Sequence, residues 1–161
     1  MFGQGKIAII TDTPSRDVLA IKTLITIVIA LMVVLLPTIT IHADQLVVTA
    51  NGHTYYAQLA ENKSARSFEQ KLRNHPVIIM AHDFEQMKKV GRLPWALPES
   101  NRELHTKPGQ INLYQGRQLS LYYHHNSWSL TPIAQIHHVT SHQLRQDLGS
   151  GKVSIKYSLG K

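Results

Sequence analysis

The chain has 161 residues, enough for one domain and a short additional segment. It contains no cysteine, which excludes disulfides, thiol catalysis and thiolate metal sites. Its formal net charge of +7 would suit acidic partners, but the basic residues are scattered, with never more than two in succession. Nucleic-acid-binding modules gather basic residues on one face. We therefore expect the charge to serve solubility and expect no nucleic-acid partner.

A hydrophobic segment, LITIVIALMVVLLPTITI, runs without a charge from Leu24 to Ile41 and follows Lys22. Its length lies at the lower limit for a membrane span. The preceding basic residue, the helix-breaking Pro37 and the small Ala43 also fit a cleaved secretory signal, which we favour over a retained anchor.

The stretch of residues that precedes this segment is unusually long for a signal peptide, which leaves two alternatives open. Either translation starts downstream of Met1, or residues 24–41 stay in the membrane as an N-terminal anchor. Both alternatives predict an extension at residues 1–43 and a domain at residues 44–161 outside the cytoplasm, secreted or anchored to the cell membrane.

From residue 45 the pattern changes to short strands and turns. QLVVTA and HTYYAQLA flank the pair Asn51-Gly52, which accepts the positive φ angles of a type I′ hairpin turn. Asn62 can cap a helix that extends through Arg73. The apolar residues on one face of that helix are Ala65, Phe68 and Leu72.

Four further segments follow the helix. Residues 77–81, VIIMA, form a continuous apolar run that predicts a strand buried on both faces. Residues 83–108 contain three prolines and predict a long irregular loop, a feature that is usually functional in a small domain. Residues 140–148 fit a short helix that ends before Gly149, and residues 153–159 alternate as a closing strand.

Between these segments, residues 109–138 predict a three-strand meander with turns at 115–116 and 126–127. A two-residue turn at 126–127 would place two apolar sets on one buried face. These sets are Leu119, Leu121 and Tyr123 on one strand, and Trp128, Leu130, Pro132, Ala134 and Ile136 on the next. Trp128 and Tyr123 are therefore predicted to be core residues.

Seven or eight strands with two short helices predict a mainly β fold, a closed antiparallel barrel capped at its ends, because closure removes exposed strand edges. Nine of the ten histidines lie at or beyond residue 44. The pairs 124–125 and 137–138 each point to opposite faces of a strand, and the predicted register separates them by about 26 Å. We therefore expect neither a metal site nor a cofactor.

Aromatic residues with an arginine suit a peptide or carbohydrate cleft. Trp95 and Arg92 belong to the proline-flanked loop, where Trp95 is expected to be exposed. Tyr122 and His124 belong to the polar face of the meander. These four residues are the candidates for a binding surface, and the catalytic residues, if any exist, are not indicated.

Several stretches together resemble one family. They are the Asn51-Gly52 hairpin, ENKSARSFEQKL at 61–72, GRLPWALP at 91–98, PGQINLYQG at 108–116, LTPIAQI at 130–136 and LRQDLGSGKVSIKY at 144–157. With them, residues 45–159 resemble the small bacterial cyclophilin-like domain, a compact relative of the cyclophilin barrel. The resemblance spans nearly all of the predicted mature chain and implies a closed cyclophilin-like barrel.

True cyclophilins isomerise X-Pro bonds, so the resemblance raises that activity as one expectation. The uncatalysed barrier is about 18–20 kcal/mol because the amide must lose its resonance. In the larger cyclophilins an arginine in a Phe-His-Arg run assists, followed by a Gln-Gly-Gly-Asp stretch. Here the corresponding region reads HPVIIMAHDF, and neither motif occurs.

We therefore expect an extracytoplasmic, non-catalytic module that binds a peptide, a protein or a wall-associated ligand. The alternative is a prolyl isomerase that assists the folding of exported proteins and takes its arginine from another position, Arg92 or Arg117. An arginine pointing into an apolar, proline-sized pocket would favour the alternative.

Overall fold

The computed structural model describes residues 15–22 and 45–160 of the chain. The chain divides into two units, Met1–His42 and Ala43–Lys161, and residues 16–22 of the first form a short helix. No helix within the described ranges is long and apolar enough to cross a membrane. The hydrophobic segment at 24–41 lies outside those ranges, so the signal and the anchor both remain predictions.

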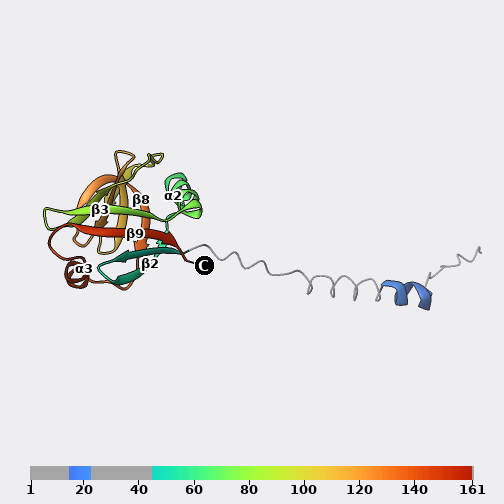
Figure 1. Cartoon of the computed structure of the whole chain (residues 1–161). Coiled ribbons are helices and arrows are strands. Elements are labelled where there is room, and N and C mark those ends of the chain that lie inside the picture. The colour runs from blue at the N-terminus through green and yellow to red at the C-terminus, as the bar shows by residue number, and fades with distance from the viewer. Residues whose placement is uncertain (1–14, 23–44, 161) are drawn as a thin grey trace, which may run out of the picture. The chain divides into compact units, whose positions relative to one another are not determined.

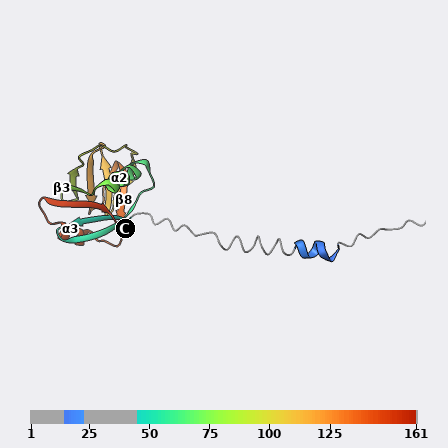
Figure 2. The same ribbon diagram turned by 45° about the vertical axis from the view of Figure 1, so that its right-hand side comes forward.

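The second unit is a mainly β structure (Figures 1 and 2). Its elements are β1 (Leu46–Ala50), β2 (His53–Leu59), α2 (Lys63–Asn74), β3 (Val77–Phe84), β4 (Lys88–Arg92), β5 (Arg102–His105), β6 (Gln110–Tyr114), β7 (Gln118–Tyr122), β8 (Ser127–Ile136), α3 (Ser141–Leu148) and β9 (Val153–Leu159).

Eight antiparallel strands close into a barrel in the order β2-β1-β9-β3-β4-β7-β6-β8. The circle is completed by β2 and β8, which pair through residues 57–59 and 134–136. β5 pairs with the first residues of β8 and lies outside this circle. The predicted closed antiparallel barrel is therefore confirmed.

Local sequence signals produce several elements as expected. Asn51 and Gly52 take positive φ angles of 48° and 79° and join β1 to β2. The Asn62 side chain accepts hydrogen bonds from the first amides of α2, and Thr140 caps α3 in the same way. These caps satisfy amides that a helix leaves without internal partners.

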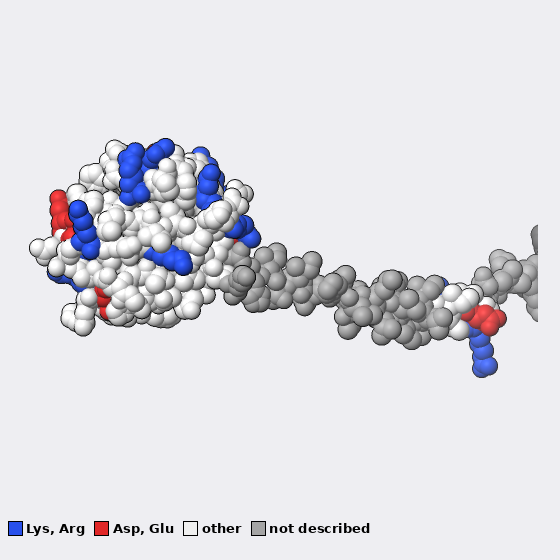
Figure 3. Space-filling view, in the orientation of Figure 1, with Lys and Arg blue, Asp and Glu red and all other residues white. Residues whose placement is uncertain are grey.

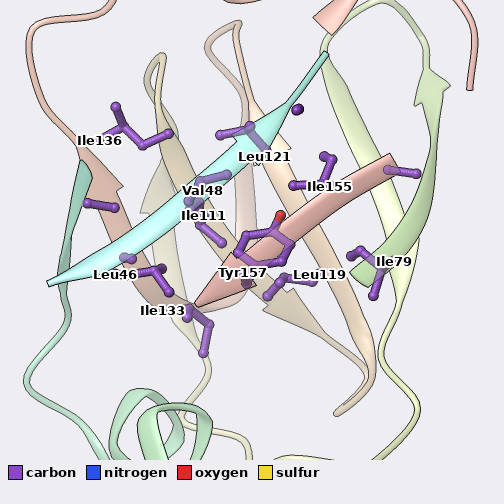
Figure 4. Close-up of a cluster of buried hydrophobic side chains, with 14 of the residues drawn as sticks. Leu46, Val48, Ile79, Ile111, Leu119, Leu121, Ile133, Ile136, Ile155 and Tyr157 are labelled. Carbon is purple, nitrogen blue, oxygen red and sulfur yellow. The ribbon is translucent and has the colours of Figure 1, made fainter. Parts of the chain in front are cut away.

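The core fills the barrel interior, where aliphatic side chains from several strands surround Tyr157 (Figure 4). Tyr157 is fully buried, and its ring centroid lies 5.9 Å from that of Phe68, which α2 contributes. The Tyr157 hydroxyl has no hydrogen-bond partner among the described residues. Burial therefore raises the pKa of Tyr157 and keeps the phenol protonated.

Two predictions for residues 77–108 are wrong. β3 is not buried on both faces, because Ile78 and Met80 are 64% and 61% exposed. The predicted loop contains β4 and β5. Residues 85–87 join β3 to β4, and two of them, Glu85 and Gln86, take positive φ without the glycine or asparagine that usually marks such a turn.

The predicted meander is wrong in its last step. β6 and β7 form the hairpin expected at residues 115–116, but the other neighbour of β7 is β4. β8 pairs with β6, so residues 126–127 are not a hairpin turn between β7 and β8. Trp128 lies opposite Leu104 of β5 instead.

A β-bulge in β8 decides which of its side chains face the interior. Ile111 of β6 lies opposite Ala134. The next residue, Asn112, lies opposite Pro132, so Ile133 is an extra residue in β8. Because side chains alternate along a strand, one extra residue reverses the faces on one side of it.

In the first half of β8, the bulge turns the side chains of Trp128 and Leu130 to the outer face of the barrel. Leu130 is buried but does not belong to the core cluster, and Trp128 is 54% exposed. The prediction that Trp128 is a core residue is therefore wrong. The same prediction for Tyr123, which is 1% exposed and belongs to the core cluster, is confirmed.

A partly buried ion pair lies near the end of the barrel where β3 turns into β4. The Lys89 ammonium, fully buried, contacts the Asp83 carboxylate at 3.2 Å and the Gly151 carbonyl at 2.8 Å. Tyr123 donates a hydrogen bond to the same carboxylate at 2.6 Å. Burial by itself would raise the pKa of Asp83, but the hydrogen bonds from Tyr123 and Lys89, with the Lys89 charge, lower that pKa below its usual value.

Two of the buried tyrosines, Tyr123 and Tyr157, give a matched test of this polar arrangement. We expect Tyr123→Phe to lower the free energy of unfolding by about 1–3 kcal/mol, because Asp83 loses a hydrogen bond. Tyr157→Phe should leave it unchanged or raise it by up to about 1 kcal/mol, because the lost hydroxyl had no partner. Urea unfolding followed by circular dichroism measures both, and an equal loss in the two variants would contradict the assignment.

Two glycines separate backbone strain from steric overlap. Gly52 and Gly109 have φ angles of 79° and 83°, but a Cβ on Gly52 meets open space whereas one on Gly109 overlaps the Ile136 carbonyl oxygen. Gly52→Ala should cost about 1–2 kcal/mol for the positive φ alone. Gly109→Ala should cost at least about 2 kcal/mol more in the same unfolding measurement. Equal costs would argue against the close approach of Gly109 to β8.

Candidate functional site

A pocket of about 390 Å³ opens on the outer face of the barrel wall that β4, β7 and β6 form. We call it the outer pocket. Its lining is His82, Phe84, Glu85, Met87, Lys88, Val90, Tyr114, Gln118, Asn126, Trp128 and Leu130. Most of these side chains are aromatic or aliphatic, as is usual for sites that hold an organic ligand.

Alternation along β4 places its residues in this pocket. Lys88 and Val90 face outward, whereas Lys89 points inward to its ion pair. Tyr122 of β7 lies directly opposite Lys88 in the register and is fully buried beneath it. The Tyr122 ring therefore supports Lys88 from outside the pocket lining.

The Lys88 side chain is held by two rings and a hydroxyl group. Its Nζ lies 4.9 Å from the ring centroids of both Phe84 and Tyr122, a geometry that attracts a cation to the ring faces. It donates a hydrogen bond of 2.9 Å to the Tyr122 hydroxyl. Lys88 takes part in no ion pair with the described residues.

The opposite wall consists of Asn126 and of Trp128 and Leu130 in the first half of β8, with β5 paired beside this strand. Thr106 donates a hydrogen bond of 3.2 Å to the carbonyl of Asn126, and its own amide donates to the same carbonyl at 2.7 Å. His105 Nδ1 and Ser127 Oγ lie 2.8 Å apart. These bonds fix the strand on which Trp128 presents its indole at the edge of the pocket.

Two of the four residues predicted from the sequence lie near β4 but not in the pocket lining. Arg92 is exposed at the end of β4. Trp95 is half-buried, contrary to expectation, because its ring packs 5.9 Å from that of Phe68 against the core.

The other two predicted residues lie on or after β7. Tyr122 supports the outer pocket through its contact with Lys88. His124 is half-buried outside the lining, and its Nε2 lies 3.5 Å from the Ser141 hydroxyl of α3. None of the four predicted residues lines the pocket. Two of them contact its lining, Tyr122 through its hydroxyl group and His124 through its amide, which donates to the Met87 carbonyl at 3.2 Å.

Sequence reasoning missed Phe84, Met87 and Lys88, because residues 83–108 were predicted to be irregular. The signal that could have revealed them is the alternation of Lys88 and Val90 after the apolar run of β3. Without a recognisable turn sequence between β3 and β4, that alternation was too short to indicate a strand.

A second hollow, of about 980 Å³, lies along β2 and the chain between β8 and α3, and we call it the β2 groove. Within it, the Asp147 carboxylate accepts a hydrogen bond from Tyr55 and lies 3.7 Å from His53 Nε2. Burial, and then the interaction with Asp147, raise the pKa of Tyr55, so its phenol remains a donor. These groups serve one another in holding α3 to β2.

Two further observations bear on the choice of site. Within residues 15–22 and 45–160, no group of three or more histidines or carboxylates is placed to hold a metal ion. On the face seen in Figure 3, lysines and arginines stand among uncharged residues. The outer pocket is the best candidate for a functional site because it combines an apolar lining with Lys88, a cation that forms no ion pair with the described residues.

The two tryptophans provide a test of this geometry. Trp128→Ala should change the free energy of unfolding by less than about 1 kcal/mol, because the indole is largely outside the core. Trp95→Ala should lower it by at least about 2 kcal/mol, because Trp95 packs on the core. Urea unfolding measures which of the two variants loses more free energy of unfolding. Iodide should quench Trp128 fluorescence in the folded chain more strongly than that of Trp95, and the reverse order would contradict the bulge.

Comparison with known proteins agrees with this architecture. The sequence model of the cyclophilin-like family matches residues 48–158, a range that begins within β1, ends within β9 and contains the other six strands of the barrel. A comparison with curated proteins gives no match. Because the family match covers more than half of the chain, and confirms the resemblance seen in its motifs, the protein is a member of the cyclophilin-like family.

Proposed function

We propose that the protein is a non-catalytic binding module whose outer pocket holds an apolar side chain of an extended peptide or protein segment. The observation that carries this proposal is a pocket of about 390 Å³ with a largely apolar lining and no arginine in it. A pocket of this size accommodates a small ligand group such as a proline ring or a leucine side chain.

The position of the arginines supports binding over catalysis. An isomerase of the cyclophilin type needs a guanidinium near the prolyl nitrogen, where the amide loses its resonance. Arg92 lies at the end of β4 and Arg117 lies in the turn between β6 and β7, and neither lines the outer pocket.

The proposed place of action is outside the cytoplasm. The support is the uncharged segment at residues 24–41 with its preceding lysine, which fits a signal or an anchor. A peptide, an exported protein or a wall-associated ligand would then be the available partner, and the membrane would be a further contact only where the segment is retained.

A second candidate function, prolyl isomerisation, has one observation in its favour. Lys88 places an ammonium donor beside the apolar lining, in a pocket whose lining contains no other lysine or arginine. An ammonium is a compact point donor and lacks the planar fork of a guanidinium. We therefore rank isomerisation second.

Binding can be tested on the full-length, nitrogen-15-labelled chain with blocked peptides Ac-Ala-Ala-X-Ala-NH₂, where X is proline, leucine or serine. The chain has two tryptophans, of which Trp128 lines the pocket and Trp95 does not. We expect the proline and leucine peptides to shift the Trp128 indole resonance saturably and to leave Trp95 unmoved. No shift of Trp128 with either peptide would overturn the proposal.

The same proline peptide distinguishes the second candidate. We expect the wild-type chain to leave its cis–trans exchange at the uncatalysed rate, with a time constant of tens to hundreds of seconds. Acceleration that Lys88→Met abolishes would establish an isomerase with a lysine donor. Acceleration lost in Arg92→Ala would assign that role to the arginine instead.

A further inference from the structure

We infer that Lys88 makes the outer pocket selective for ligands that carry a carboxylate next to their apolar group. This inference rests on the proposed function and names the ligand class of the same pocket. It depends on three properties of Lys88, namely its fixed position, its lack of a counter-ion and its place in an apolar lining.

The Lys88 ammonium is held in place before any ligand arrives. Contacts of 4.9 Å with the Phe84 and Tyr122 rings and a 2.9 Å hydrogen bond to the Tyr122 hydroxyl restrict a side chain that is otherwise flexible. An ammonium has three N–H donors, and Tyr122 uses one of them. Tyr122 thus acts as a positioning residue, and further donors remain for a ligand.

The neighbouring lysine, Lys89, provides a comparison, because it has a counter-ion. Lys89 forms an ion pair with the Asp83 carboxylate and donates a hydrogen bond to the Gly151 carbonyl. Lys88, one residue earlier, forms no ion pair with the described residues, although Glu85 lines the same pocket. A half-buried cation without a counter-ion has lost hydration that an incoming carboxylate would replace.

The ligand chemistry follows from this arrangement. An apolar side chain would occupy the lining around Val90, Leu130 and Trp128, and a carboxylate would accept a charge-assisted hydrogen bond from Lys88. The carboxylate can belong to an acidic residue beside the apolar one or to the C-terminus of the peptide. Both sources present the same group, and separate peptides distinguish them.

The test compares four peptides on the full-length chain, read by the Trp128 indole resonance. Ac-Ala-Ala-Leu-Glu-NH₂ is set against its Gln counterpart, and Ac-Ala-Ala-Leu with a free C-terminal carboxylate is set against its amide. We expect at least one acid to bind about tenfold or more tightly than its neutral partner, as one charged hydrogen bond predicts. Added salt should weaken the binding of the acidic peptide and leave the affinity of the neutral peptide unchanged.

Variants assign the preference to Lys88. Lys88→Met should remove the preference for the acid, while Lys88→Arg should keep it. Lys156→Met, which removes an exposed lysine on the outer face of β9, is the matched control and should leave the preference intact. Should Lys88→Met fail to fold, the salt dependence in the wild-type chain still decides the point.

Each outcome has a distinct meaning. A preference in the Glu pair alone identifies an acidic side chain, a preference in the C-terminal pair alone identifies a chain end, and both support the inference. Acids and neutral peptides that bind equally through Trp128 overturn the inference and leave the proposed function standing. A Trp128 resonance that no peptide shifts overturns both.

Discussion

The arrangement of the barrel and its outer pocket depends on one extra residue in β8. After the bulge at Ile133, the side chains of Ala134 and Ile136 face the core. Ile136 also lies opposite Ala57 of β2, where the two strands pair and close the barrel. On the other side the phase is reversed, and the same strand presents Trp128 outward. A regular β8 could satisfy only one of these requirements, because alternation along a strand is strict.

The barrel consequently has two separate apolar regions with different roles. The interior excludes water and supplies the hydrophobic free energy that stabilises the fold. The outer pocket leaves aromatic and aliphatic groups in contact with solvent, which costs free energy unless a ligand covers them. Lys88 and Lys89 illustrate the division, because Lys88 points to the pocket and Lys89, the next residue on β4, points inward to its ion pair with Asp83.

The candidate site was only partly predictable for a reason that its residues make clear. Tyr122 was among the predicted residues because aromatic side chains together with an arginine suit a binding cleft. Lys88 and Phe84 were not predicted, since the turn between them contains Glu85 and Gln86 in a backbone conformation that those residue types seldom adopt. Trp95 packs against the core although it was expected to be exposed, because its ring contacts Phe68 of α2. Trp128 is exposed although it was expected in the core, because β8 carries a bulge. Neither the packing of α2 nor the bulge is a local property of the sequence.

The sequence by itself determined the features that depend on neighbours in the chain. These are the Asn51-Gly52 turn, the caps at Asn62 and Thr140, the apolar face of α2 and the alternation of β9, each set by φ preferences, end amides or side-chain period. Its family motifs also indicated the barrel. Tertiary structure alone decided that β7 lies between β4 and β6, that β8 carries a bulge and that Lys88 faces an apolar pocket. Strand order and register are selected by the burial of the whole core, so no short stretch of residues contains them.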